Sequence, residues 1–279
     1  LAEANKKLET DTLTCVEGLQ AVGILLDTDL YVPDNFLLEK EGVTFLYNTY
    51  DIAPYYKHTM LQGERLGFVF PVYAWAPPQT VTDFVKNLEL YYSGDPYLFA
   101  VCTCGSSAGE AIDLLGKALQ ENGLTLDSGF SVVMPDSFTV LFDAGTKAEQ
   151  YALLEKADRT LDNILRAIRL NWSNFFRVKK GRGAGVLSKI VNPAFRRGLK
   201  TKPFYVTEDC SHCGLCERVC TSGCIRLTAG IPVWTEKHCN MCMACVNRCP
   251  QTAIQYGKST TKRGRYVHPI YQNRKGESE

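Results

Sequence analysis

Between residues 66 and 170 the hydrophobic positions alternate between short continuous runs and helical spacing. Continuous apolar runs predict buried strands at 66–70, 97–102 and 130–134. Apolar positions three and four residues apart predict helices at 80–92, 107–122 and 148–170. Strands that alternate with helices in this order predict an α/β fold, with a parallel sheet covered by helices on both faces.

The pattern is less regular on either side of this region. Before it, residues 22–26 and 43–47 predict two further short strands. After it, residues 171–207 contain nine Lys and Arg but no Asp or Glu. Glycines at positions 181, 183 and 185 favour a flexible hinge there. We therefore expect a domain at 1–170, a basic linker at 171–202, a small domain at 203–258 and a mobile basic tail at 259–279.

The small domain contains two runs of cysteines with the same spacing, C-x2-C-x2-C-x3-C, 29 residues apart. The first run is Cys210, Cys213, Cys216 and Cys220, and the second is Cys239, Cys242, Cys245 and Cys249. Such a loop wraps three thiolates around one [4Fe–4S] cluster, while the fourth cysteine reaches the other cluster. We therefore assign Cys210, Cys213, Cys216 and Cys249 to one cluster, and Cys239, Cys242, Cys245 and Cys220 to the other.

The two runs make residues 203–230 and 231–258 an internal repeat. The repeat aligns Cys224 with Ala253, so we expect Cys224 to be a small packing residue and not a ligand. Thr221 stands where the second half has Pro250. The alternative is structural zinc, but zinc sites usually combine cysteine pairs that are far apart in the sequence.

The composition and charge of the chain limit which other classes of function it can have. The chain has 279 residues, a net charge of +1, 45% hydrophobic and 22% charged residues. These values are typical of globular proteins and give no overall nucleic-acid or membrane character. No apolar run approaches the length of a membrane helix. Labile clusters and thiols outside any disulfide framework favour a reducing cytoplasm.

Two loops at the predicted carboxyl edge of the sheet are candidate ligand contacts, because α/β sheets bind ligands there. The first offers two aromatic rings, and the second offers backbone N–H groups and hydroxyls next to a helix N-terminus. An aromatic cap on the core and a plain turn are the structural alternatives. The loops are Tyr73, Ala74, Trp75 and Ala76, and Thr103, Cys104, Gly105, Ser106 and Ser107.

The cysteine runs resemble those of the bacterial two-cluster ferredoxins. Together with runs 67–77, 99–109 and 129–137, residues 60–258 resemble a family that fuses a flavodoxin-like domain to such a ferredoxin. The resemblance implies a flavodoxin-like doubly wound parallel sheet and a small α+β ferredoxin-like domain. It also implies FMN binding at the two loops named above. Residues 1–60 depart from the family because they contain no Ser/Thr-Gly-rich phosphate loop. The loop either precedes residue 1, since the chain begins at Leu1, or has been lost.

The expected function is electron transfer between FMN and two [4Fe–4S] clusters, with a redox protein partner that the basic linker suggests is acidic. The alternative is a non-enzymatic carrier or adaptor whose first domain binds a protein and no flavin. We find no nucleophile–base pair and no paired catalytic carboxylates, so no substrate-transforming site is identified.

Overall fold

The computed structural model describes residues 43–45, 56–60, 63, 65–198, 200–220, 222–235 and 239–269. These residues fall into two compact units. The first holds the described residues up to Met134 together with Ala152–Phe195, and the second holds Pro135–Tyr151 and the described residues from Arg196 onward. The strand predicted at 22–26 lies outside the described residues. So do residues 1–60, which contain no recognisable phosphate loop, apart from 43–45 and 56–60.

A five-stranded sheet forms the centre of the first unit, and every neighbouring pair of strands is parallel. This confirms the α/β fold class. The strands lie in the order β1 (Val43–Phe45), β3 (Arg65–Pro71), β5 (Tyr97–Cys104), β6 (Ser128–Val133) and β7 (Phe175–Arg177).

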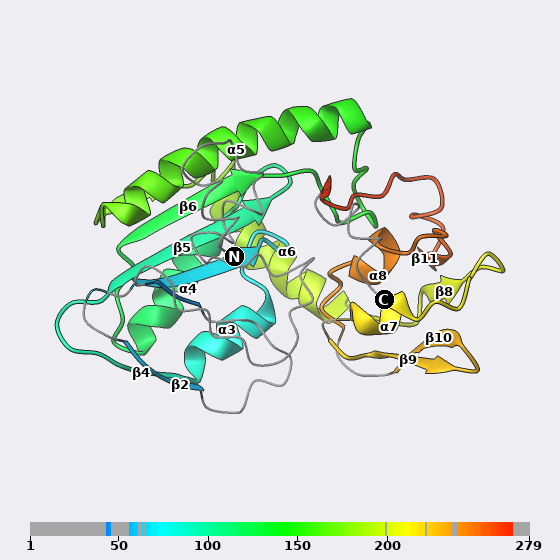
Figure 1. Cartoon of the computed structure of the whole chain (residues 1–279), viewed down its shortest axis with the longest axis horizontal. Coiled ribbons are helices and arrows are strands. Elements are labelled where there is room, and N and C mark those ends of the chain that lie inside the picture. The colour runs from blue at the N-terminus through cyan, green and yellow to red at the C-terminus, as the bar shows by residue number, and fades with distance from the viewer. Residues whose placement is uncertain are drawn as a thin grey trace, which may run out of the picture. The chain divides into compact units, whose positions relative to one another are not determined.

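Alternate side chains of β5 supply the two hydrophobic cores. Leu98, Ala100 and Cys102 pack with residues of α3 (Gln79–Lys86) and α4 (Ala111–Glu121) on one face. Phe99 and Val101 pack with α5 (Lys147–Arg169) on the other. Because successive side chains of a strand point to opposite faces, one apolar run serves both cores. The helices therefore cover both faces of the sheet (Figure 1).

The helix predicted at 80–92 is only half as long as expected. After Lys86, the backbone N–H and the side-chain amide of Asn87 both bond to the carbonyl of Asp83 and end the helix. Leu88–Tyr91 is a strand, β4, that pairs in parallel with β2 (Tyr56–Thr59). The spacing of apolar residues continues the helical pattern through Leu88. The structure is instead decided by pairing with β2, whose residues lie 32 positions earlier in the sequence than their partners in β4.

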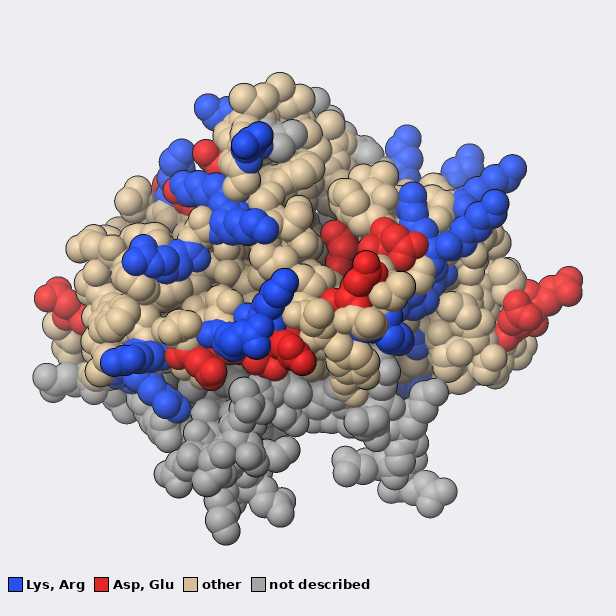
Figure 2. Space-filling model, turned by 90° about the horizontal axis from the view of Figure 1, so that it is seen from above, with Lys and Arg blue, Asp and Glu red and all other residues tan. Residues whose placement is uncertain are grey.

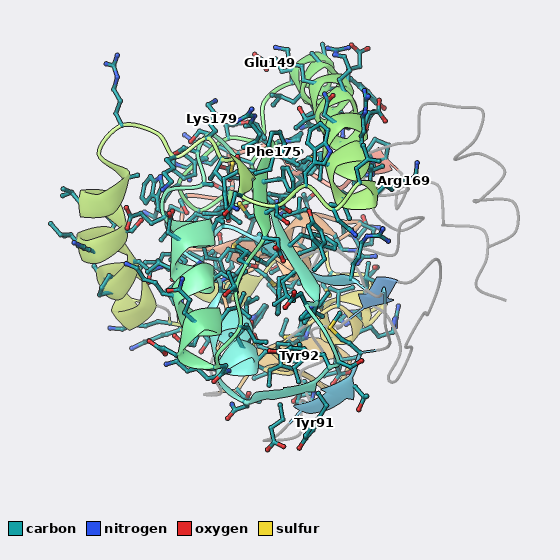
Figure 3. All side chains as sticks on the ribbon, turned by 90° about the vertical axis from the view of Figure 1, so that its left-hand side faces the viewer. Tyr91, Tyr92, Glu149, Arg169, Phe175 and Lys179 are labelled. Carbon is teal, nitrogen blue, oxygen red and sulfur yellow. The ribbon has the colours of Figure 1, made fainter. Side chains whose placement is uncertain are left out.

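The segment expected to be a linker contains regular structure. The chain leaves α5 at Arg169 and enters β7 at Phe175 (Figure 3). The ring of Phe175 packs against those of Phe130 and Trp172, with ring centres 6.0 and 4.9 Å apart. A further helix, α6 (Ala184–Gly198), begins directly after Gly183 and includes Gly185.

The strand order bears on the flavodoxin-like prediction. In a flavodoxin-like sheet the first strand lies between the second and the third, and the ligand binds where the order reverses. Across the described residues, the five strands follow one another in chain order without such a reversal. The flavodoxin-like topology therefore stays a prediction.

The second unit repeats one arrangement of a short helix and strands. The first half contains β8 (Phe204–Val206), α7 (Leu215–Arg218) and β9 (Ile225–Thr228), and the second contains β10 (Ile231–Trp234), α8 (Ala244–Asn247) and β11 (Ile254–Tyr256). β8 pairs with β11 and β9 pairs with β10, both antiparallel. Each two-stranded sheet thus takes one strand from each half, so the halves are interlocked.

The start of the expected mobile tail is packed into this second unit. Tyr266 and His268 are buried, and the Thr260 hydroxyl bonds to the Gln255 side chain. The Arg263 guanidinium donates to the carbonyls of Thr139 and Val140. Among the described residues, no helix is both long enough and apolar enough to cross a bilayer.

The outer side of α5 carries exposed residues of both charges, among them Glu155, Lys156, Asp162 and Arg166 (Figure 2). Interspersed charges of opposite sign give this face no single-signed field.

Candidate metal centre

Left-handed backbone turns shape both cysteine loops. In the first half φ is positive at His212, Gly214 and Gly223, with values of 57°, 71° and 55°. The positions 29 residues later also have positive φ, although none of them is a glycine: Met241 (57°), Met243 (61°) and Thr252 (53°). Side chains disfavour this conformation, so the surrounding loop must hold it in place. The sequence repeat is thus also a repeat of backbone shape.

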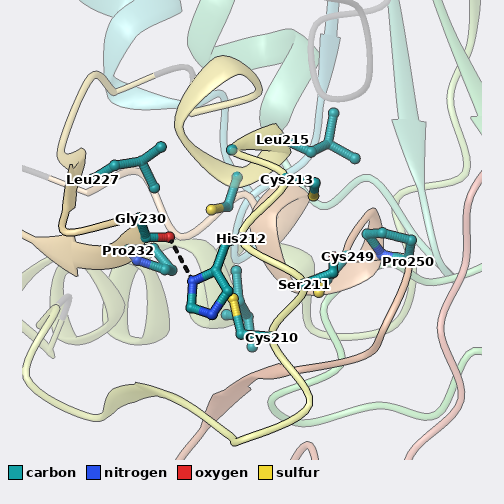
Figure 4. Close-up of a pocket in the computed structure, with 13 residues that line it drawn as sticks. Cys210, Ser211, His212, Cys213, Leu215, Leu227, Gly230, Pro232, Cys249 and Pro250 are labelled. Carbon is teal, nitrogen blue, oxygen red and sulfur yellow. Dashed lines mark hydrogen bonds between the residues drawn. The ribbon is translucent and has the colours of Figure 1, made fainter.

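Cysteines of both halves meet around one cavity of about 340 Å³, part of which is open solvent (Figure 4). Cys210, Cys213 and Cys216 line it from the first run, and Cys249 lines it from the second. Apolar side chains and prolines surround them, including Leu215, Leu227, Pro232, Pro250 and Ile254. These four cysteines are the set that the spacing assigned to one cluster.

The cysteines of the second predicted set, Cys239, Cys242, Cys245 and Cys220, also influence one another electrostatically. Burial raises the pKa of the Cys245 thiol well above its usual value, and negative charge on Cys242, Cys239 and Cys220 raises it further. Cys242, Cys239 and Cys220 therefore all lie within electrostatic range of Cys245. Cys216 of the first set acts on Cys245 as well, which indicates that the two sets adjoin.

Backbone N–H groups point at the sulfur atoms. The N–H of Cys224 donates to Cys220 Sγ at 3.3 Å, and the equivalent N–H of Ala253 donates to Cys249 Sγ at 3.3 Å. The N–H of Met241 donates to Cys239 Sγ at 3.4 Å. Donors of this kind favour the thiolate over the thiol. Thiolates are the form that binds iron.

Cys224 takes part more closely than a packing residue would. Its Sγ lies 3.6 Å from Cys220 Sγ, and it also hydrogen-bonds the side chain of Cys239. The hydrogen bond between Cys224 and Cys220 is the largest of the effects that lower the pKa of Cys220 to about 6. The same hydrogen bond raises the pKa of Cys224. Sequence reasoning missed this role, although a fifth cysteine four positions after a ligand was its signal.

A partly buried cation, Arg265, lies near both sets. Burial lowers the pKa of Arg265, and negative charge on Cys249 and Cys245 counteracts this effect. Its Nη2 donates to Gln255 and Ile254, whereas its buried Nε and Nη1 have no hydrogen-bond partner within the described part of the chain. A buried cation needs compensating negative charge. The thiolate sets next to Arg265, with an anionic cluster bound, would supply it, so the residues present fit the group.

The arrangement suits a cluster better than a single ion. In the described ranges, no three His, Cys, Asp or Glu residues converge closely enough to hold one metal ion. A structural zinc ion needs four ligands at about 2.0–2.3 Å from one point. A four-iron cluster instead spreads its four thiolates around a larger body, as thiols that line a shared cavity do.

The two loops expected to contact flavin lie close together, as predicted. Trp75 Nε1 donates to Ser107 Oγ at 3.1 Å. Tyr73 and Ala76 exchange two backbone hydrogen bonds across a tight turn, in which Ala74 and Trp75 have positive φ. In the second loop Thr103 and Cys104 end β5, and Cys104 is buried while Gly105 and Ser106 are exposed.

Other segments of the chain already occupy the polar groups of these loops. The N–H groups of Ala108 and Gly109 donate to the carbonyls of Lys179 and Lys180. From α6, Ser188 Oγ donates to the Trp75 carbonyl at 2.8 Å and Asn192 Nδ2 donates to the Tyr73 carbonyl at 3.0 Å. The two N–H groups that directly follow the second candidate loop are thus bonded within the protein. Sequence reasoning missed Ser188 and Asn192, although two uncharged polar residues four positions apart in α6 were their signal.

Comparisons with known proteins match two short parts of the chain. A family model described as a protein of unknown function, DUF3298, matches residues 2–59. Ferredoxin-1 of Chlorobaculum tepidum is 37% identical to the chain over 59 residues, which are 19% of this chain and 95% of that protein. No solved structure matches the chain. Over this 19% of its length, the chain belongs to the ferredoxin family.

Proposed function

We propose that the chain is an iron–sulfur electron-transfer protein that holds two [4Fe–4S] clusters in its second unit. The observation that carries this proposal is the shared cavity, in which Cys249 of the second run joins Cys210, Cys213 and Cys216 of the first. The ferredoxin match supports it. Cys220, Cys239, Cys242 and Cys245 would hold the second cluster.

When bound, each cluster would supply one-electron chemistry. The chain's own residues hold it and set its potential. Backbone N–H groups donate to Cys220, Cys239 and Cys249, and Arg265 places positive charge beside both sets. Both features stabilise added negative charge and so favour reduction. Because each set takes a cysteine from the other half, the two clusters would lie close enough for electrons to pass between them.

The first experiment is a reductive titration of anaerobically purified protein with dithionite, followed by visible absorbance. We expect the absorbance to fall as about two electrons per chain are taken up, one for each cluster. It should recover when an artificial acceptor is added. Uptake of no electrons by iron-loaded protein would refute electron transfer.

The flavin-free form of this function is favoured by one specific observation. The N–H groups of Ala108 and Gly109, directly after the second candidate loop, donate to the carbonyls of Lys179 and Lys180, so they are not available to a flavin. We therefore propose that the first unit serves as a scaffold for a protein partner. An FMN titration of the same preparation should show no stoichiometric binding, and tight binding of one FMN would restore the alternative with FMN as electron partner.

An acidic redox protein is the proposed partner. The segment from 171 to 207 has nine basic and no acidic residues, and Lys180 pairs with Asp113 at 2.7 Å while Lys179, Arg182 and Lys189 are exposed. Exposed positive charge steers an acidic protein to its site. A reducing cytoplasm is the proposed location, because free thiols and labile clusters persist there.

A further inference from the structure

The two halves of the second unit differ at one position that touches the cluster ligands. The 29-residue repeat aligns Cys220 with Cys249, and Cys224 with Ala253. The backbone donors are matched, because the N–H groups of Cys224 and Ala253 each lie 3.3 Å from the aligned sulfur. The side chains are not matched, since a thiol faces Cys220 and only a methyl group is present at Ala253.

The Cys224 side chain is held in place. It is 1% exposed, and its Sγ is 3.6 Å from Cys220 Sγ. Its carbonyl accepts hydrogen bonds from the N–H and the hydroxyl of Thr235, at 2.7 and 3.1 Å. These contacts fix the backbone at Cys224 against Thr235, which directly follows β10, so the thiol remains beside Cys220 and Cys239.

The chemistry determines which sulfur donates. This step rests on the proposed function, in which Cys220 and Cys239 bind iron as thiolates and carry no proton. Cys224 then holds the S–H among the three sulfurs, so it donates and a ligand sulfur accepts. Reduction adds one electron to the cluster and makes its ligand sulfurs more negative. A hydrogen bond to such a sulfur becomes stronger on reduction and raises the potential.

We propose that Cys224 is a positioning residue that donates its S–H to the ligands of one cluster and makes the two clusters unequal in potential. The cluster held by Cys220, Cys239, Cys242 and Cys245 has the higher potential. Arg265 interacts with Cys249 of one set and with Cys245 of the other, so its charge is not confined to either cluster site. Electrons that enter the protein would therefore settle first on the cluster beside Cys224.

The test is a redox titration of the anaerobic, cluster-loaded protein, monitored by electron paramagnetic resonance, for the wild type and for Cys224→Ala. We expect the wild type to show two potentials. The variant should keep all its iron and sulfide, and its higher potential should fall. At a fixed ambient potential the ratio of reduced to oxidised cluster should drop about tenfold, which is about 59 mV for a one-electron couple. The other potential serves as an internal control and should not move.

Cys224→Ser is the matched variant, because a hydroxyl can also donate a hydrogen bond. We expect it to retain most of the wild-type potential. The inference is wrong if neither potential moves in Cys224→Ala, if both move equally, or if Cys224→Ser shifts as far as Cys224→Ala. Loss of about four irons from Cys224→Ala would also overturn it, because Cys224 would then be a ligand. A wild-type chain that binds no iron would instead refute the proposed function.

Discussion

Gly67 shows how a single residue is fixed by packing between adjacent strands, because it lies opposite Phe99 in the β3–β5 pair. A Cβ added at Gly67 would lie 2.2 Å from Cζ of Phe99, which is fully buried. The ring has no room to withdraw inside a packed core. We predict that Gly67→Ala destabilises the first unit by about 1–3 kcal/mol, measured by urea unfolding followed by far-UV circular dichroism.

Gly116 provides the control within the same unit. It lies in α4, and a Cβ added there would have no atom within 4 Å. Because alanine favours the helix, Gly116→Ala should leave stability unchanged or raise it by up to about 1 kcal/mol. Equal effects of the two substitutions would show that contact with Phe99 does not decide the residue at position 67.

At the scale of elements, α6 holds the candidate loops of the first unit through Ser188. Its hydroxyl donates to the Trp75 carbonyl and accepts from the N–H of Glu110. Ser188→Ala removes both hydrogen bonds, while the N–H of Glu110 still donates to the Trp75 carbonyl at 3.3 Å. We therefore predict a loss of about 0.5–1.5 kcal/mol, measured by thermal unfolding. Ser173→Ala, at an exposed position, should change stability little. If the two variants melt alike, α6 is not anchored through this hydroxyl.

Elements with strong local patterns could be predicted from the sequence, and those that depend on distant partners could not. The strands at 66–70, 97–102 and 130–134 and the helix at 148–170 were found within two residues of their bounds. β4 and β7 were missed because each exists by pairing with a strand far away in the sequence. The second helix begins at Ala111 and not at residue 107, because residues 107–109 are bonded to Trp75 and to the 179–180 backbone.

The candidate site was predictable to the extent that spacing fixes geometry. Four cysteines of the first predicted set line one cavity because C-x2-C-x2-C loops bring three sulfurs together and the interlocked strands bring the fourth. The role of Cys224 depends on the direction of one side chain, which no spacing reveals. The engagement of the loop N–H groups depends on residues some 70 positions later.

At the scale of the whole molecule, the account depends on the crossing of the two cysteine runs. Cys249 lies 33 residues or more from the cysteines with which it shares a cavity. Cys249→Ala should therefore remove one cluster, although the first run of four cysteines stays complete. Cys102→Ala is the control, because Cys102 is buried in the sheet of the first unit.

The most direct test is the amount of iron and acid-labile sulfide per chain in anaerobically purified wild type, Cys249→Ala and Cys102→Ala. Two [4Fe–4S] clusters predict about eight of each for the wild type and for Cys102→Ala, and about four of each for Cys249→Ala. A folded wild-type chain that holds no iron after anaerobic reconstitution, or a Cys249→Ala variant that keeps the full amount, would contradict the account.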